Sequence, residues 1–294
     1  MSDSRFRAAV PWRRRVAVVA ACAAAVVLPA GSAWAAKLAE PFTPFSHCPV
    51  DAPEMIESGP TVFGTGCVAT SSPRGEFAIG DMVVQTAQTE VQFGLAGSGE
   101  RGIPATEGRT LAAEPVEVPG GLLGFEPPEA LAPLFRLLDP LLGVTATVEL
   151  AGDVTGFDAN GALAPGKPIV TLPVKIRLRN PLLGGNCTIG SDANPILLRP
   201  QTITQGTISG SAVSGVLVLE ISGATLGDDS FAVPRAEGCG PLGLLDRIVD
   251  QQVGLPSPEG RNRIVLEDAT MATALSQQGG AKLAEAWHAH VIEE

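Results

Sequence analysis

The stretch from Leu172 to Leu198, LPVKIRLRNPLLGGNCTIGSDANPILL, most constrains what this chain can fold into. It opens with alternating apolar and basic residues, a pattern typical of a strand with one buried and one solvent-exposed face. An Asn-Pro pair and an Asp-Ala-Asn-Pro run then indicate two turns on either side of Cys187. Strands joined by such short loops favour an antiparallel sheet, because parallel strands need long crossover connections.

The same alternation recurs along the chain. In residues 144–150, Val144, Ala146, Val148 and Leu150 point one way, and the threonines and Glu149 between them point the other way. Further strands are expected in residues 82–95, 194–198, 201–209, 215–226 and 264–271. Short strands with turn residues between them predict an all-β fold, an antiparallel sandwich or barrel.

A few segments depart from this pattern. Residues 115–143 are rich in Pro and Leu and could contain a short helix over Glu129–Leu138. Helical spacing also appears in residues 242–252, through Leu244, Leu245, Ile248 and Val249, and in residues 281–292. Residues 152–161 are expected to bend or end a strand, with Asn160-Gly161 as a hairpin turn.

The first 35 residues predict a secretory signal peptide. Five arginines precede the apolar run Val16–Leu28, and Ala33-Trp34-Ala35 matches a small-residue cleavage site. The run is shorter than the ~20 residues of a membrane-spanning helix. Lipidation at Cys22 and a twin-arginine export route are the alternatives. We therefore expect a secreted or envelope-associated protein with one β-rich domain, residues 36–275, and a C-terminal helical tail, residues 276–294.

Four cysteines would remain after cleavage: Cys48, Cys67, Cys187 and Cys239. An even number in an exported protein predicts two disulfides, and three pairings are possible. Proximity in the sequence favours Cys48 with Cys67 and Cys187 with Cys239. A zinc site is the alternative, but the C-x-x-C spacing is missing.

The charge of the mature chain excludes some partners. The first 35 residues hold five of the 20 basic residues and one of the 31 acidic ones, so their removal leaves a net charge near −15. Such a surface repels nucleic acid and anionic lipid, which both require Lys and Arg. No later segment is long and apolar enough to span a membrane, so we do not expect an integral membrane protein after cleavage.

The residues that carry chemistry form no recognisable set. No G-x-S-x-G elbow is present, and only His47, His288 and His290 supply imidazoles. The calcium-like run Asp158–Gly161 lacks the other ligands of such a loop. His288 and His290 near Glu285 are read as a solvated tail. The sequence thus singles out no catalytic, cofactor-binding or metal-ligating residue, and its only predicted site residues are the four disulfide cysteines.

Residues 180–198, NPLLGGNCTIGSDANPILL, and residues 239–271, CGPLGLLDRIVDQQVGLPSPEGRNRIVLEDATM, carry a resemblance. They resemble an uncharacterised family of secreted actinobacterial proteins with a Cys-x-Ile-Gly-Ser loop, a late cysteine and a Gly-Leu-Pro-Ser turn. The resemblance implies secretion and a pairing of the late cysteines. It implies no activity.

Three functions stay open at this point. The first is a non-enzymatic secreted β protein that acts as a structural or interaction module with an envelope or extracellular partner. The second is a carrier of a small apolar, lipid-like ligand inside the β structure, with Leu122–Leu142 as a lid. The third is a hydrolase with an unrecognised site that uses His47 as its base.

Overall fold

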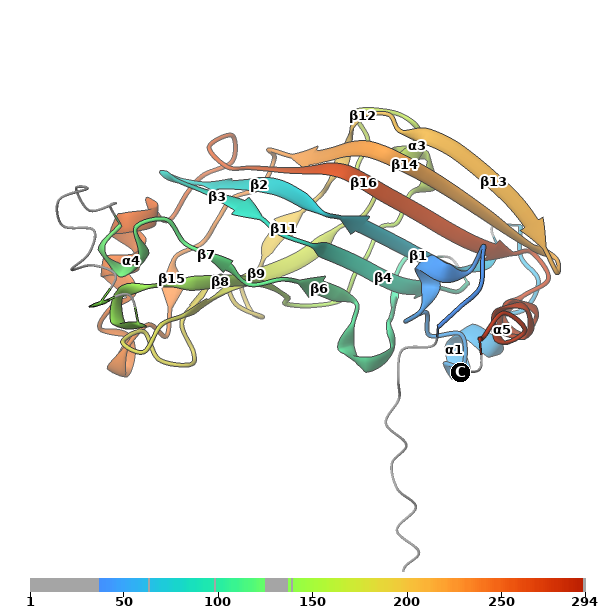
Figure 1. The fold of residues 1–294 in the computed structure, drawn as a ribbon, viewed down its shortest axis with the longest axis horizontal. Helices are drawn as coiled ribbons and strands as arrows, with labels where there is room; N and C mark the ends of the chain where they lie inside the picture. The colour runs from blue at the N-terminus through green and yellow to red at the C-terminus, as the bar shows by residue number, and fades with distance from the viewer. Residues whose placement is uncertain (1–36, 63, 98, 125–136, 139, 293–294) are drawn as a thin grey trace, which may run out of the picture. The chain divides into compact units, whose positions relative to one another are not determined.

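A computed structural model describes residues 37–62, 64–97, 99–124, 137–138 and 140–292, all within one compact unit. The unit is all-β in architecture, with two antiparallel sheets and a few short helices (Figure 1). Among these residues the strand order of neither sheet returns to its first strand, so the fold is a sandwich rather than a closed barrel. The predicted signal peptide and nearly all of the expected helix Glu129–Leu138 lie outside the described residues.

The larger sheet has ten strands in the described part of the chain. Its central path runs β12-β14-β16-β1-β4-β5, with β2, β3, β6 and β13 beside it. The strands are β1 (Thr65–Ser72), β2 (Arg74–Ile79), β3 (Met82–Thr86), β4 (Thr89–Leu95), β5 (Ile103–Pro104), β6 (Leu111–Ala113), β12 (Gln201–Thr204), β13 (Thr207–Val213), β14 (Val216–Asp228) and β16 (Arg263–Ser276).

The smaller sheet has six strands in the same described ranges, in the order β15-β10-β9-β8-β7, with β11 also paired to β9. They are β7 (Val116–Glu117), β8 (Thr145–Leu150), β9 (Leu172–Arg179), β10 (Thr188–Ile189), β11 (Ile196–Leu198) and β15 (Ala236–Glu237). The labelled helices are α1 (Pro53–Ile56), α3 (Ala159–Leu163), α4 (Asp246–Val253) and α5 (Gly280–His288).

Strand β9 is the centre of the smaller sheet. One of its edges pairs with β8, and the other pairs first with β11 and then with β10 from the chain that follows it. Leu172–Leu198 therefore folds back on itself, as its two turns predict. The first turn is fixed by Asn180, whose amide donates to the carbonyl oxygens of Leu141 and Gly143, both at 2.8 Å, while its side-chain oxygen accepts from Leu182 N.

The alternation predicted for β9 is confirmed. Val174, Ile176 and Leu178 are buried, whereas Lys175, Arg177 and Arg179 lie on the outer face. On that outer face Arg177 binds Glu149 of β8 through two hydrogen bonds, of 2.6 and 2.9 Å. These bonds lower the pKa of Glu149 below its ordinary value. The outer face of the smaller sheet therefore carries an ion pair and is accessible to solvent.

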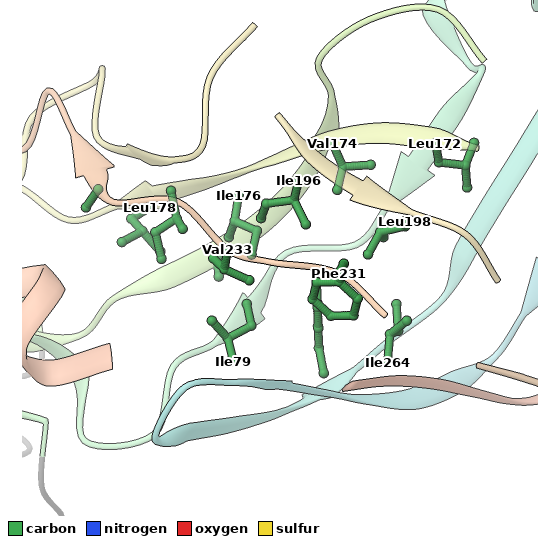
Figure 2. Packing of buried hydrophobic residues seen from close by; sticks show 14 of the residues in the cluster. Ile79, Leu172, Val174, Ile176, Leu178, Ile196, Leu198, Phe231, Val233 and Ile264 are labelled. Atoms are coloured by element: carbon green, nitrogen blue, oxygen red, sulfur yellow. The ribbon is translucent and has the colours of Figure 1, made fainter. Parts of the chain in front are cut away.

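The main core lies between the two sheets. Figure 2 shows Val174, Ile176, Ile196 and Leu198 of the smaller sheet on one side, with Ile79 and Ile264 of the larger sheet opposite. The segment that follows β14 passes between them and contributes Phe231 and Val233. The ring of Phe231 packs edge-on against Phe77 of β2, with centroids 5.7 Å apart.

A second core covers the other face of the larger sheet near the chain ends. The N-terminal arm and α5 pack there, with Phe42, Phe45, Leu283 and Trp287 buried. Trp287 donates its indole N–H to the carbonyl oxygen of Phe45 at 2.9 Å. The C-terminal tail is therefore packed within the same unit as the sheets.

Both disulfides have the pairing that sequence proximity favours. Cys48 is bonded to Cys67 and attaches the N-terminal arm to β1. Cys187 is bonded to Cys239 and attaches the loop before β10 to the segment after β15. Two structural disulfides indicate an oxidising compartment.

The local predictions differ from the structure at two places. Asn160-Gly161 forms no hairpin turn, because Asp158 caps the N-terminus of α3 by accepting from Asn160 N at 2.8 Å. The helix expected in residues 242–252 is present as α4, but it begins only at Asp246, after Leu242 adopts a left-handed conformation. Of the four spaced residues, Val249 is buried whereas Leu244 is 73% exposed.

We predict that the double substitution Cys187→Ser/Cys239→Ser lowers the free energy of unfolding by about 2–5 kcal/mol, because the reduced chain gains entropy when unfolded. The Cys48–Cys67 disulfide closes a shorter loop, so Cys48→Ser/Cys67→Ser should lower the free energy of unfolding by roughly 1 kcal/mol less in the chain-entropy model. Urea denaturation measures both values. Equal stability of the first variant and the parent, or a Cys48–Cys187 peptide in non-reducing mapping, would contradict this account.

Candidate functional site

The chain passes from the larger sheet to the smaller one between β6 and β7. β6 pairs with β4 of the larger sheet, and β7, which follows after only two residues, pairs with β8 of the smaller one. Those two residues are Glu114 and Pro115. The backbone N–H of Glu114 still donates to the carbonyl oxygen of Gln88 at 3.0 Å, but Pro115 has no N–H with which to continue the ladder. The chain therefore leaves one sheet at this point and joins the other.

An apolar cavity lies between the two sheets, beside the point where the chain crosses from β6 to β7. It has a volume of about 80 Å³. Its walls come from β2, β3, β7, β8, β9 and α4. The apolar residues of the walls include Phe77, Ile79, Met82, Val84, Val116, Val118, Leu122, Val144, Ala146, Val148, Ile176, Leu178, Val249 and Val253. The polar residues among its walls are Thr86, Thr89, Glu114 and Gln252.

A second apolar cavity of about 60 Å³ adjoins the first one. The two share Phe77, Thr86, Thr89 and Val148 as wall residues. The second cavity extends toward Leu172 and Leu198 in the smaller sheet and Ile264 in the larger one. Two small apolar cavities therefore lie next to each other between the sheets, with these four residues forming walls of both.

Five of the apolar side chains around the first cavity are incompletely buried. Met82, Val84, Val116, Val118 and Leu122 are only half-buried, although they point between the sheets. Removing accessible apolar surface from water is favourable by a free energy of about 25 cal/mol per Å². A bound apolar molecule would gain this free energy by covering these side chains.

Water is a poor occupant of this space. One water needs about 10–15 Å³ and two to four polar partners, and cavities lined by aliphatic and aromatic side chains stay dry. The cavity has the room, but its walls provide few hydrogen-bonding groups. The arrangement therefore suits a hydrocarbon ligand better than a cluster of waters.

Thr86 is a polar wall residue whose hydroxyl group lacks a hydrogen-bond partner among the described residues. Its hydroxyl oxygen is buried. It faces Gly75 across the β2–β3 ladder, and a Cβ on that glycine would lie 2.8 Å from it. The neighbouring Thr89 differs, because its hydroxyl donates to the carbonyl oxygen of Ala87 at 3.2 Å.

The predicted site residues lie elsewhere. None of Cys48, Cys67, Cys187 and Cys239 is a wall residue of either cavity; they stabilise the fold around it. Two segments of the sequence carry a signal for the cavity walls: residues 82–86 are β-compatible, and Val116 and Val118 alternate with Glu117 in residues 115–118. The second segment was assigned to the Pro- and Leu-rich insertion, so its pairing with β8 was missed.

His47 lacks the surroundings of a catalytic base. Its Nδ1 atom is buried without a hydrogen-bond partner in the described residues, and the nearest acidic partner is Glu107 Oε2 at 3.7 Å. No described hydroxyl or thiol hydrogen-bonds to its ring, and Cys48 beside it is oxidised. A nucleophile held by this histidine therefore has no counterpart in the described structure.

The C-terminal histidines bind different partners. His288 Nε2 lies 2.8 Å from Asp51 Oδ1, and His290 Nδ1 lies 2.7 Å from the carbonyl oxygen of Ala286. Asp158 is occupied as a helix cap, and the hydrogen bond from the Asn160 amide lowers its pKa. The described residues bring together no group of three or more His, Cys, Asp or Glu side chains suited to a metal ion.

Comparison with protein-family models, curated proteins and solved structures found no match to this chain. Within the described residues, no helix combines the length and the apolar character needed to cross a bilayer.

We predict that Thr86→Val raises the free energy of unfolding of the ligand-free protein by about 1 kcal/mol, because it removes a buried hydroxyl that lacks a partner at nearly constant volume. Thr89→Val is the matched control, since that hydroxyl has a hydrogen bond to lose, and it should give no gain. Urea denaturation of both variants measures the difference. A loss of stability in Thr86→Val as large as in the control would contradict this assignment.

Proposed function

We propose that the chain is an exported, non-enzymatic β-sandwich protein that binds a small apolar molecule, such as the alkyl chain of a lipid-like compound, between its sheets. The observation that carries this proposal is the pair of adjoining apolar cavities beside the β6–β7 crossing. Half-buried side chains from both sheets are among the residues that surround the larger of the two without filling it. Protein cores are normally packed with few voids larger than a water molecule.

The shape and chemistry of the space support an apolar ligand. Small-molecule sites are concave and mostly apolar, with a few polar groups that orient the ligand. Here Thr86 and Glu114 are among those polar residues. Gln252 completes them; its amide donates to the carbonyl oxygen of Leu122 and fixes α4 beside the cavity. The lid expected over Leu122–Leu142 lies largely outside the described residues.

Export is the second part of the proposal. It is supported by the two disulfides and by the signal-peptide pattern of residues 1–35. The resemblance to secreted actinobacterial proteins stays a prediction. The alternative function, a structural or interaction module, also stays a prediction. No feature of the cavity region supports it.

We predict that Val84→Trp weakens binding of a dansyl-labelled fatty acid by about tenfold or more, because the indole would occupy the space between β3 and β7. Val83→Trp is the matched control. Val83 directly precedes Val84 in β3, lies on the opposite face and is 50% exposed. Its replacement should therefore leave binding unchanged. Fluorescence titration measures both affinities.

Two results would overturn the proposal. The first is a parent protein that produces no enhancement of the probe's fluorescence. The second is an equal effect of the two tryptophan variants, which would place the probe outside the cavity. Native mass spectrometry of the protein from its own host gives an independent reading, and the absence of any co-purifying apolar compound would favour the structural module.

A further inference from the structure

Strand β13 (Thr207–Val213) forms a long, unpaired edge of the larger sheet. It pairs with β14 on one side over its whole length. On its other side no described residue makes a backbone hydrogen bond to it, and six of its seven residues are exposed. Figure 1 shows β13 along the outer margin of the sheet. A free edge of this kind can pair with a strand from another chain.

Most other edge segments of the sandwich are protected by being short. β5, β7 and β15 have two residues each, and β6 has three. Proteins also protect free edges with Lys, with other charges, with Pro or with a bulge. The sequence of β13, TISGSAV, contains no charged residue and no Pro, and its ladder with β14 has no register shift. This edge therefore carries none of the usual devices against pairing.

We propose that β13 is an interface at which two copies of this chain pair antiparallel, with Gly210 of one copy opposite Gly210 of the other. The order of residues around Gly210 supports a second copy as the partner. In that register Ile208 lies opposite Ala212, Ser209 opposite Ser211 and Thr207 opposite Val213. The Ile208–Ala212 pair is apolar and the Ser209–Ser211 pair is polar, whereas Thr207 and Val213 share only a β-branched shape; a two-fold axis repeats each pair on the other side of Gly210.

The apolar pairs lie next to exposed apolar surface. By register, Ile208 and Ala212 share a face with Leu217, Leu219 and Ile221 of β14. Ile208 is 52% exposed and Leu217 is 46% exposed, so this corner of the sheet is uncovered in a single copy. Edge pairing would place the corners of the two copies side by side and bury part of both, a gain of about 25 cal/mol per Å².

Charge does not oppose the pairing locally. Glu220 is the acidic residue nearest to the centre of β13, on the face that carries Ser209. In the dimer the two Glu220 side chains would be three strand spacings apart, ~14 Å, which exceeds the screening length of ~8 Å at physiological salt. The remaining repulsion comes from the net charge of each chain, which is near −15 once residues 1–35 with five basic residues and one acidic residue are removed. Added salt should therefore strengthen this dimer, whereas it would weaken the binding of a basic partner strand.

A charge-swap experiment tests the interface. In the variant Ile208→Lys/Ala212→Lys each lysine would face a lysine of the other copy, and like charges directly opposite one another are destabilising. Both positions are exposed, so the monomer should fold. We expect sedimentation velocity to show a concentration-dependent dimer for the parent and an increase of about tenfold or more in the dissociation constant for this variant.

The partner variant, Ile208→Glu/Ala212→Glu, should also be monomeric alone, and an equal mixture of the two should restore a dimer. Val83→Lys, on the edge strand β3 of the same sheet, is the matched control and should dimerise like the parent. A parent that stays monomeric up to sub-millimolar concentration would overturn the proposal. A lysine variant that still dimerises, or a mixture that does not, would also overturn it, because the contact would then lie elsewhere.

Discussion

Burial of the inner face of β9 is the interaction on which the rest of the unit depends. Val174, Ile176 and Leu178 are each almost inaccessible to solvent, and a fully buried aliphatic side chain contributes about 1.5–3 kcal/mol. The flanking strands β8, β10 and β11 all take their register from β9, and Phe231 and Val233 fill the space between this face and the larger sheet (Figure 2). The Cys187–Cys239 disulfide then holds the loop that returns from β9 against the segment leading into α4.

The cavity results from the limits of that packing. The core is dense around Phe231, where a third layer of chain lies between the sheets, and it opens beyond that layer toward β3 and β7. Pro115, which has no N–H to continue the ladder, lies where the chain leaves one sheet and joins the other. The half-buried valines of β3 and β7 lie beside this crossing, and they give the proposed ligand its binding surface.

The sequence predicts those parts of this structure that depend on local pattern. The alternation in residues 172–179 and 144–150 identifies β9 and β8 with the correct inner faces, and proximity identifies both disulfides. Local pattern gave the wrong structure at Asp158, because an Asp residue suits a helix cap as well as a turn. It also misplaced the start of α4, because the backbone conformation of Leu242 delays the helix. The cavity could not be predicted, since it depends on the distance between strands of different sheets. The unpaired edge of β13 likewise becomes visible only when the strand order is known.

The most direct test of the central claim is a crystal structure of the purified protein under xenon pressure, because xenon binds in dry apolar cavities. The account predicts xenon density between Val84, Val116 and Val148, at the space shared by the two sheets. Density for ordered waters in that space, or side chains that close it completely, would contradict the claim that the sandwich keeps an apolar binding cavity.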